Sequence, residues 1–160
     1  MKKLKKIDSI KFLNETFVGI TFENTVYYNC TFFNCNFKSV TWKNCQFKNT
    51  YILGNSNLEN CKFISCKFLG QNTNMGGPTK YLDCEFTNIL FKNNQFWNTN
   101  FENCSFTGKA ENIVFYGPYS PNGWETVFKN VDLSEMDLKL VDFRCEIDLE
   151  TTKLPTHKKI

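Results

Sequence analysis

Large apolar residues recur at every fifth position along the first third of the chain. From Ile10 to Gly54 the sequence divides into nine five-residue units, and the third residue of each unit is large and apolar. These central residues are Phe12, Phe17, Phe22, Tyr27, Phe32, Phe37, Trp42, Phe47 and Ile52. The first residue is usually small or β-branched, and the fifth is mostly Asn. A period of five fits neither a helix nor a simple strand, so it predicts a repeat architecture.

The geometry of an extended chain explains what such a unit can build. Residues one and three point to the same side, whereas residues two and four point away. If the chain turns at each unit boundary, four units close a square coil of about twenty residues, and successive coils stack roughly 4.7–4.9 Å apart. Asn suits the turning fifth position, because it tolerates left-handed backbone and hydrogen-bonds locally. Glycine occupies the same slot at Gly19, Gly54, Gly70 and Gly108.

These units resemble the pentapeptide-repeat family, whose consensus is a small residue, Asp or Asn, Leu or Phe, and two variable positions. The resemblance covers most of residues 10–154, and units such as VDLSE and VDFRC lie close to the consensus. It implies an all-β fold, a right-handed quadrilateral β-helix (a solenoid of pentapeptide repeats) with roughly six to seven coils. The length of 160 residues predicts a single domain, 1–160.

Two segments break the period inside this domain. Residues 71–78 (QNTNMGGP) are predicted to form a loop extruded from a corner, and residues 109–125 are predicted to form a second, aromatic-bearing loop. The repeats are therefore assigned to residues 10–70 and 79–154. Residues 1–9 are expected to cap the open end of the coil, with lysines that resist end-to-end stacking, and residues 155–160 form a polar tail.

The cysteines follow the repeat rather than a disulfide pattern. Of the eight cysteines, only Cys145 lies outside the first, inward position of a unit. Inward cysteines behave as small apolar residues, so neither disulfides nor metal sites are expected, and a reducing, cytoplasmic location follows. The net charge of +3 argues against a dedicated nucleic-acid binder. No run approaches the roughly 20 apolar residues of a membrane span, so no membrane association is expected.

No pattern in the chain predicts catalysis. His157 is the only histidine and lies in the polar tail, and no phosphate-binding loop, nucleophile elbow or metalloprotease motif occurs. We expect no enzyme activity, no catalytic residue, no bound metal and no cofactor.

The outward residues predict a contact surface instead. If the loop at 71–78 leaves the corner count intact, every fourth unit shares a face, and two adjacent faces then concentrate the apolar fourth residues. Contiguous apolar patches are uncommon on monomers and mark contacts. The predicted partner-binding residues are Phe33, Leu53, Leu82, Tyr28, Leu69 and Trp97 on these faces, with Met75, Tyr116, Tyr119 and Trp124 from the loops. The alternative is that the chain's own loop at 109–125 covers both faces.

A non-enzymatic protein-binding role follows from these features. The resemblance implies two versions of it. The first is an immunity or antitoxin-type protein that binds and neutralises a bacterial toxin. The alternative is a DNA mimic that binds and protects DNA gyrase or topoisomerase IV, for which members of the family carry a long acidic face. Here seven acids fall within residues 131–150, against two basic residues. A homodimer of structural role is the third candidate.

Overall fold

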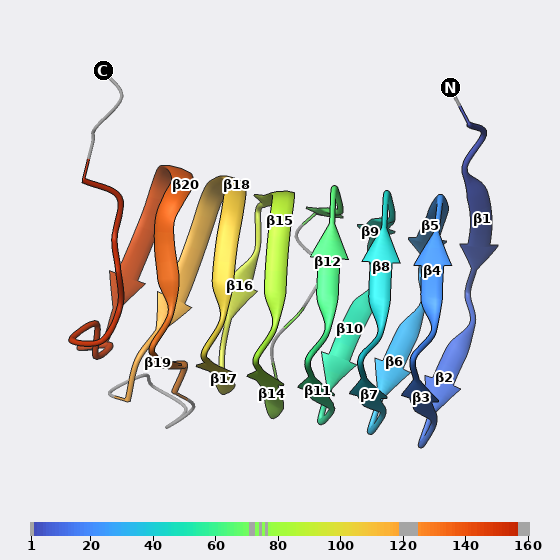
Figure 1. Ribbon diagram of the computed structural model, residues 1–160, viewed down its shortest axis with the longest axis horizontal. Coiled ribbons are helices and arrows are strands. Elements are labelled where there is room, and N and C mark those ends of the chain that lie inside the picture. The colour runs from blue at the N-terminus through green and yellow to red at the C-terminus, as the bar shows by residue number, and fades with distance from the viewer. Residues whose placement is uncertain (1, 71–72, 74, 76, 119–124, 157–160) are drawn as a thin grey trace.

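The computed structural model describes residues 2–70, 73, 75, 77–118 and 125–156. They form an all-β solenoid in which short strands stack along one axis, with the N- and C-termini at opposite ends (Figure 1). The strands are β1 (Lys5–Asp8), β2 (Lys11–Leu13), β3 (Thr16–Val18), β4 (Thr21–Glu23), β5 (Thr25–Tyr28), β6 (Thr31–Phe33), β7 (Asn36–Lys38), β8 (Thr41–Lys43), β9 (Gln46–Lys48), β10 (Tyr51–Gly54), β11 (Asn57–Glu59), β12 (Lys62–Ile64), β13 (Lys67–Leu69), β14 (Thr79–Leu82), β15 (Glu85–Lys92), β16 (Gln95–Phe96), β17 (Thr99–Glu102), β18 (Ser105–Tyr116), β19 (Val127–Lys129) and β20 (Asp132–Arg144).

The strands stack into four sides, and every pair is parallel. Side 1 holds β2, β6, β10, β16 and the last residues of β18 and β20. Side 2 holds β3, β7, β11, β14, β17 and β19, a six-stranded sheet. Side 3 holds β4, β8, β12 and the first residues of β15, β18 and β20. Side 4 holds β1, β5, β9, β13 and the later residues of β15, β18 and β20. The predicted quadrilateral β-helix is therefore confirmed.

Asparagine turns the chain at the corners, as the repeat predicts. Asn24 and Asn44 occupy the same corner on successive coils, and both adopt a left-handed backbone with φ of 52°. Asn44 Nδ2 donates to Asn24 Oδ1 at 2.8 Å. The backbone conformation and the side-chain ladder thus depend on the same residue type.

Stacked rings fill the axis of the solenoid. Phe63 lies between Trp42 and Phe86, with ring centroids 4.6 Å and 4.8 Å away and the rings nearly parallel. The thiols stack in the same way, and the seven cysteines predicted to face inward are buried and free. Contact with neighbouring thiols and loss of solvation raise the pKa of Cys66 and Cys84. These two thiols therefore stay protonated at neutral pH and are not nucleophiles.

The repeats begin earlier than the sequence pattern indicated. Strand β1 pairs in parallel with β5, and Ile7 lies opposite Tyr27 in the position of a central residue. Residues 5–9 are thus the first side of the first coil. The prediction that these residues form a cap is wrong. Their side chains are mostly charged, but their backbone pairs with β5 as in any other side, and Ile7 supplies the inward residue.

The segment at 71–78 also contributes to the coil. Thr73 and Met75 are both buried, at 1% and 0% exposure. Thr73 Oγ1 donates to the Leu69 carbonyl at 2.6 Å, and the Tyr81 hydroxyl donates to the Met75 carbonyl at 2.8 Å. The Gly77 N–H donates to the Trp97 carbonyl at 2.9 Å, the bond that corner residues make elsewhere. Residues 73, 75 and 77 therefore hold the first, third and fifth positions of a unit on side 1, and the prediction of an extruded loop is wrong for them.

Residues 109–116 are strand rather than loop. Ala110 in β18 lies opposite Phe91, and Gly108 lies opposite Ile89. Gly108 is therefore the first residue of a unit, not the fifth residue of the preceding one. A Cβ at Gly108 would lie 2.2 Å from the Ile89 carbonyl oxygen, so only glycine fits this shortened corner. Residues 119–124 of the predicted loop lie outside the described residues.

Candidate functional site

Counting residues 73–77 as a side changes which outward residues share a face. Leu82 lies opposite Glu59 on side 2, so it does not join Phe33. Trp97 follows β16 on side 1, and Tyr116 ends β18 on the same side. Fourth-position residues of side 1 are Leu13, Phe33, Gly54, Trp97, Tyr116 and Arg144. A register shift after Tyr51 places Gly54, rather than the predicted Leu53, opposite Phe33. We call Leu13, Phe33, Trp97, Tyr116 and Arg144 the side-1 column; the side chain of Leu53 lies outside the described residues.

The amino-terminal part of this column is exposed and apolar. Phe33 lies opposite Leu13, and the two side chains are 48% and 47% exposed. Tyr51 extends the patch on the next coil from a second-position site and is also exposed. Residues 109–118 do not cover these side chains, because residues 105–116 are themselves part of the stack.

The carboxy-terminal part of the column is a ladder of three large side chains. The Trp97 indole stacks on the Tyr116 ring with centroids 3.6 Å apart and planes 10° apart. Arg144 lies opposite Tyr116 on the next coil. The Arg144 guanidinium pairs with Asp142 at 2.7 Å, and this partner raises its pKa. Trp, Tyr and Arg are the residue types that most often anchor protein interfaces.

The other predicted binding residues lie apart from this column. Tyr28 and Leu69 lie on side 4, where Tyr28 is opposite Lys48 and the Lys6 ammonium sits 4.8 Å from its ring. Met75 lies in the core, so the prediction that it contacts a partner is wrong: its thioether fills the third position of a unit. Tyr119 and Trp124 fall outside the described residues.

Sequence reasoning missed two contributors to side 1. Tyr51 stands in a second position, and Arg144 was assigned only to an acidic segment. The spacing of Thr73, Met75 and Gly77 is the signal that recovers the column, because it matches positions one, three and five of a unit.

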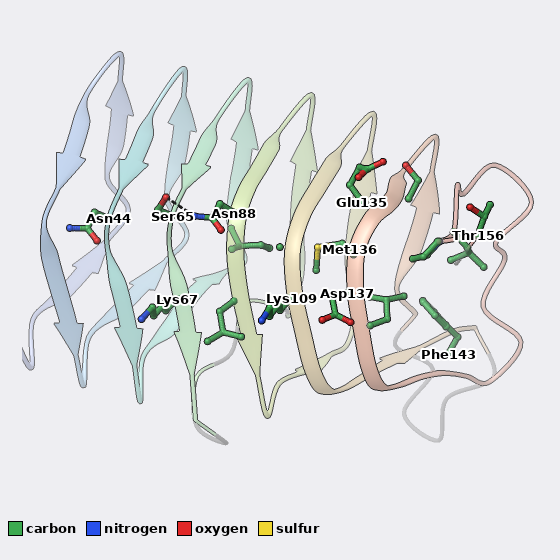
Figure 2. Close-up of a pocket in the computed structure, with 17 residues that line it drawn as sticks. Asn44, Ser65, Lys67, Asn88, Lys109, Glu135, Met136, Asp137, Phe143 and Thr156 are labelled. Atoms are coloured by element: carbon green, nitrogen blue, oxygen red, sulfur yellow. Dashed lines mark hydrogen bonds between the residues drawn. The ribbon is translucent and has the colours of Figure 1, made fainter. Parts of the chain in front are cut away.

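A groove runs along the corner between sides 3 and 4 (Figure 2). Lys67, Lys109 and Asp137 point from its side-4 wall, and at the corner itself Asn88 Nδ2 donates to Ser65 Oγ at 3.2 Å (Figure 2). The carboxy-terminal end of the groove is apolar at Phe143 and Leu154. These groups do not converge on one point as a catalytic site requires.

Within the described ranges, no group of three or more His, Cys, Asp or Glu side chains is placed to hold a metal ion. None of the described residues belongs to a helix long and apolar enough to cross a bilayer.

Comparison with known proteins gives only distant structural similarities. No family model and no curated protein matches the chain. The solved structure of trypsin-treated QnrB1, a plasmid-mediated fluoroquinolone resistance protein, is similar over 96% of this chain and 92% of that chain, with 16% identity and a TM-score of 0.47. HetL, a pentapeptide repeat protein involved in heterocyst differentiation regulation in Nostoc sp. strain PCC 7120, gives 10% identity and a TM-score of 0.32 over 96% and 91% of the two chains.

The protein Rfr23 from the cyanobacterium Cyanothece 51142 gives 12% identity and a TM-score of 0.33, over 94% of this chain and 88% of that chain. Identities this low transfer no function. The resemblance to pentapeptide repeats instead depends on the chain itself, whose five-residue period coincides with the sides of the coil outside the interruptions near residues 71–78, 108 and 118–125. By repeat and by architecture, the chain resembles the pentapeptide-repeat proteins.

Proposed function

We propose that this protein is a non-enzymatic binding module of the immunity or antitoxin type, which binds and neutralises a bacterial toxin in the cytoplasm. The side-1 column carries the proposal. It places a stacked Trp97–Tyr116 pair and Arg144 in one line with exposed Leu13 and Phe33. A surface of this composition suits a protein partner better than a small molecule.

Rigidity of the scaffold supports the same conclusion. The column stands on parallel strands whose rings are stacked beneath it, such as Phe96 on Phe115 at 4.8 Å. Side chains that are already ordered lose less freedom when a partner binds. The charges on side 1 lie near its two ends, Lys11 in β2 and the Asp142–Arg144 pair in β20, which leaves the middle free for an apolar contact.

The DNA-mimic alternative requires carboxylates along one face. The four acids of β20 are instead divided among three sides: Asp132 and Glu135 on side 3, Asp137 on side 4 and Asp142 on side 1. Asp132 and Asp142 also pair with Lys153 and Arg144. No single face of the described chain reproduces a phosphate backbone, and this distribution favours the apolar binding mode.

The test is a binding experiment with the purified product of the neighbouring gene, at about 50 and 500 mM salt. An apolar contact predicts an affinity that changes less than about tenfold between the two, whereas a phosphate-like contact loses far more. Trp97→Ala should weaken binding by roughly 30-fold or more, as expected for an anchor residue. Lys43→Gln on side 3 is the matched control and should bind like the wild type.

Two further readouts separate the outcomes. Co-expression of this protein should restore growth of cells that make the partner, and the Trp97→Ala variant should not. The melting temperature of Trp97→Ala should equal that of Trp97→Phe, so that the lost protection reflects lost binding. Binding to gyrase that disappears at high salt and is insensitive to Trp97→Ala would replace the proposal with the DNA-mimic function.

A further inference from the structure

The amino-terminal end of the solenoid is open. Ile10 and Ile20 hold inward first positions, yet they are 45% and 41% exposed, whereas Cys30 and Val40, their equivalents one coil later, are 1% and 0% exposed. Within the described residues, each of the strands β1 to β4 pairs with one strand only. The end therefore presents both an apolar interior and unpaired strand edges.

The carboxy-terminal end is open on two sides. Leu138 and Phe143 in β20 are only partly buried, whereas Ala110 and Phe115, which lie opposite them in β18, are buried. Apart from a bridge from its first residue to Lys153, β20 has no partner on its outer edge in the described part of the chain.

The two ends are in phase. The last coil passes through side 4 and side 1 in β20 and returns to side 3 at Lys153. The side that follows side 3 is side 4, and the first coil begins on side 4 with β1. A second copy stacked beyond the last coil would therefore continue the order of sides without a gap.

The two ends also have opposite charges. Residues 2–11 contain five lysines and one acid, whereas residues 131–150 contain seven acids and two basic residues. We propose that this protein assembles head to tail, with the basic amino-terminal end of one copy stacked on the acidic carboxy-terminal end of the next. The interface uses the strand edges at the two ends of the solenoid, and the proposal does not rest on the function proposed for side 1.

Side 4 shows the complementarity at residue level. In the parallel register of every internal pair, the sequence Lys6–Ile7–Asp8 of one copy lies over Asp137–Leu138–Lys139 of the other. Lys6 then faces Asp137 and Asp8 faces Lys139, with apolar residues meeting between them. Lys6 and Asp8 already form an ion pair at 3.1 Å, so the contact completes a network of four alternating charges.

Side 1 repeats the match with other residues. Lys11 of β2 lies over Asp142, and Phe12 lies over Phe143, which extends the ring stack of the core. Within one chain, Phe12 stacks on Phe32 at 4.6 Å and Phe143 stacks on Phe115 at 5.4 Å. Each ring therefore has one stacking partner on its inner face and gains a second across the interface.

The lysines also select the direction of assembly. If two amino-terminal ends met, their lysines would repel each other. The acidic carboxy-terminal end attracts the same lysines, so only the head-to-tail contact is favourable. Head-to-tail contact is heterologous, and a heterologous contact that does not close a ring grows into a filament. The expected product is a linear array rather than a dimer.

Sedimentation velocity of the full chain, from about 5 µM to 500 µM at low and high salt, tests this proposal. The wild type should grow progressively beyond a dimer with concentration, and about 500 mM salt should reduce the average mass severalfold. Lys6→Glu with Lys11→Glu should remain monomeric, as should Asp137→Lys with Asp142→Lys. Mixing the two double variants restores opposite charges at each junction and should restore assembly.

Circular dichroism melts check that both double variants stay folded. A wild type that remains monomeric at 500 µM overturns the proposal. A wild type that stops at a dimer overturns it as well, because a closed pair requires like ends to meet. The proposal is also overturned by folded double variants that assemble alone as the wild type does, or that fail to assemble when mixed.

Discussion

Replacing Met75 with alanine tests whether residues 73–77 are a side of the coil. Met75 is fully buried, and the substitution removes three heavy atoms from the core. The lost transfer free energy is about 2–2.5 kcal/mol at roughly 0.8 kcal/mol per group. The cavity left between stacked residues adds to this, so we expect a loss of about 3 kcal/mol in the free energy of unfolding. For a chain of this size that corresponds to a decrease of roughly 6–12 °C in the melting temperature.

Urea titration followed by circular dichroism measures the loss directly. Met75→Leu keeps most of the volume and should cost less than about 1.5 kcal/mol. Lys80→Ala, on the exposed face of β14, is the surface control and should change stability by less than about 0.5 kcal/mol. If Met75→Ala is as stable as this control, residues 73–77 lie outside the core and do not count as a side. Trp97 would then not lie on side 1.

Three further predictions concern the core, a corner and an acid. Cys84→Asp places an unpaired charge among stacked thiols, so its free energy of unfolding should fall by more than about 4 kcal/mol, measured by urea titration. Gly108→Ala brings a Cβ within 2.2 Å of the Ile89 carbonyl oxygen and should lower the melting temperature far more than Gly70→Ala, which meets no atom within 4 Å. Hydrogen bonds from Ser134 lower the pKa of Asp132, so the stability that they contribute is present at neutral pH and is lost as pH falls through the folded pKa. The free energies of unfolding of the wild type and Asp132→Asn, measured against pH, should therefore converge at low pH.

The repeat predicted most of the fold because it specifies both the core and the corners. An aromatic residue every fifth position requires a ring stack, and Asn in the last slot supplies the left-handed turn, as Asn24 and Asn44 show. The inward cysteines followed from the same spacing, and their burial is confirmed.

Prediction from the five-residue period failed where small or flexible residues fill the inward positions. Met75 stands where an aromatic ring is usual, and glycines lie on both sides of the unit, so the unit resembles a loop. Ala110 likewise stands where a ring is expected, and the shortened corner at Gly108 hides the register. Hydrogen bonds to neighbouring coils stabilise both units, and a periodicity analysis does not detect such contacts.

The candidate site depended on this count of sides. Trp97 was predicted as a contact residue on the neighbouring face, and Tyr116 was predicted to lie in a loop. The structure brings the two rings together on side 1 because one uncounted unit rotates every later column by a quarter turn. The ladder to Arg144 follows only once strand register is known.

The affinity of the neighbouring gene's product for Trp97→Ala and Tyr116→Ala, measured by isothermal titration at low and high salt, tests the central claim most directly. Binding through the side-1 column predicts that each variant loses roughly 30-fold or more at both salt concentrations, while Lys43→Gln binds like the wild type. Wild-type affinity in both column variants would contradict the claim that side 1 is the binding surface.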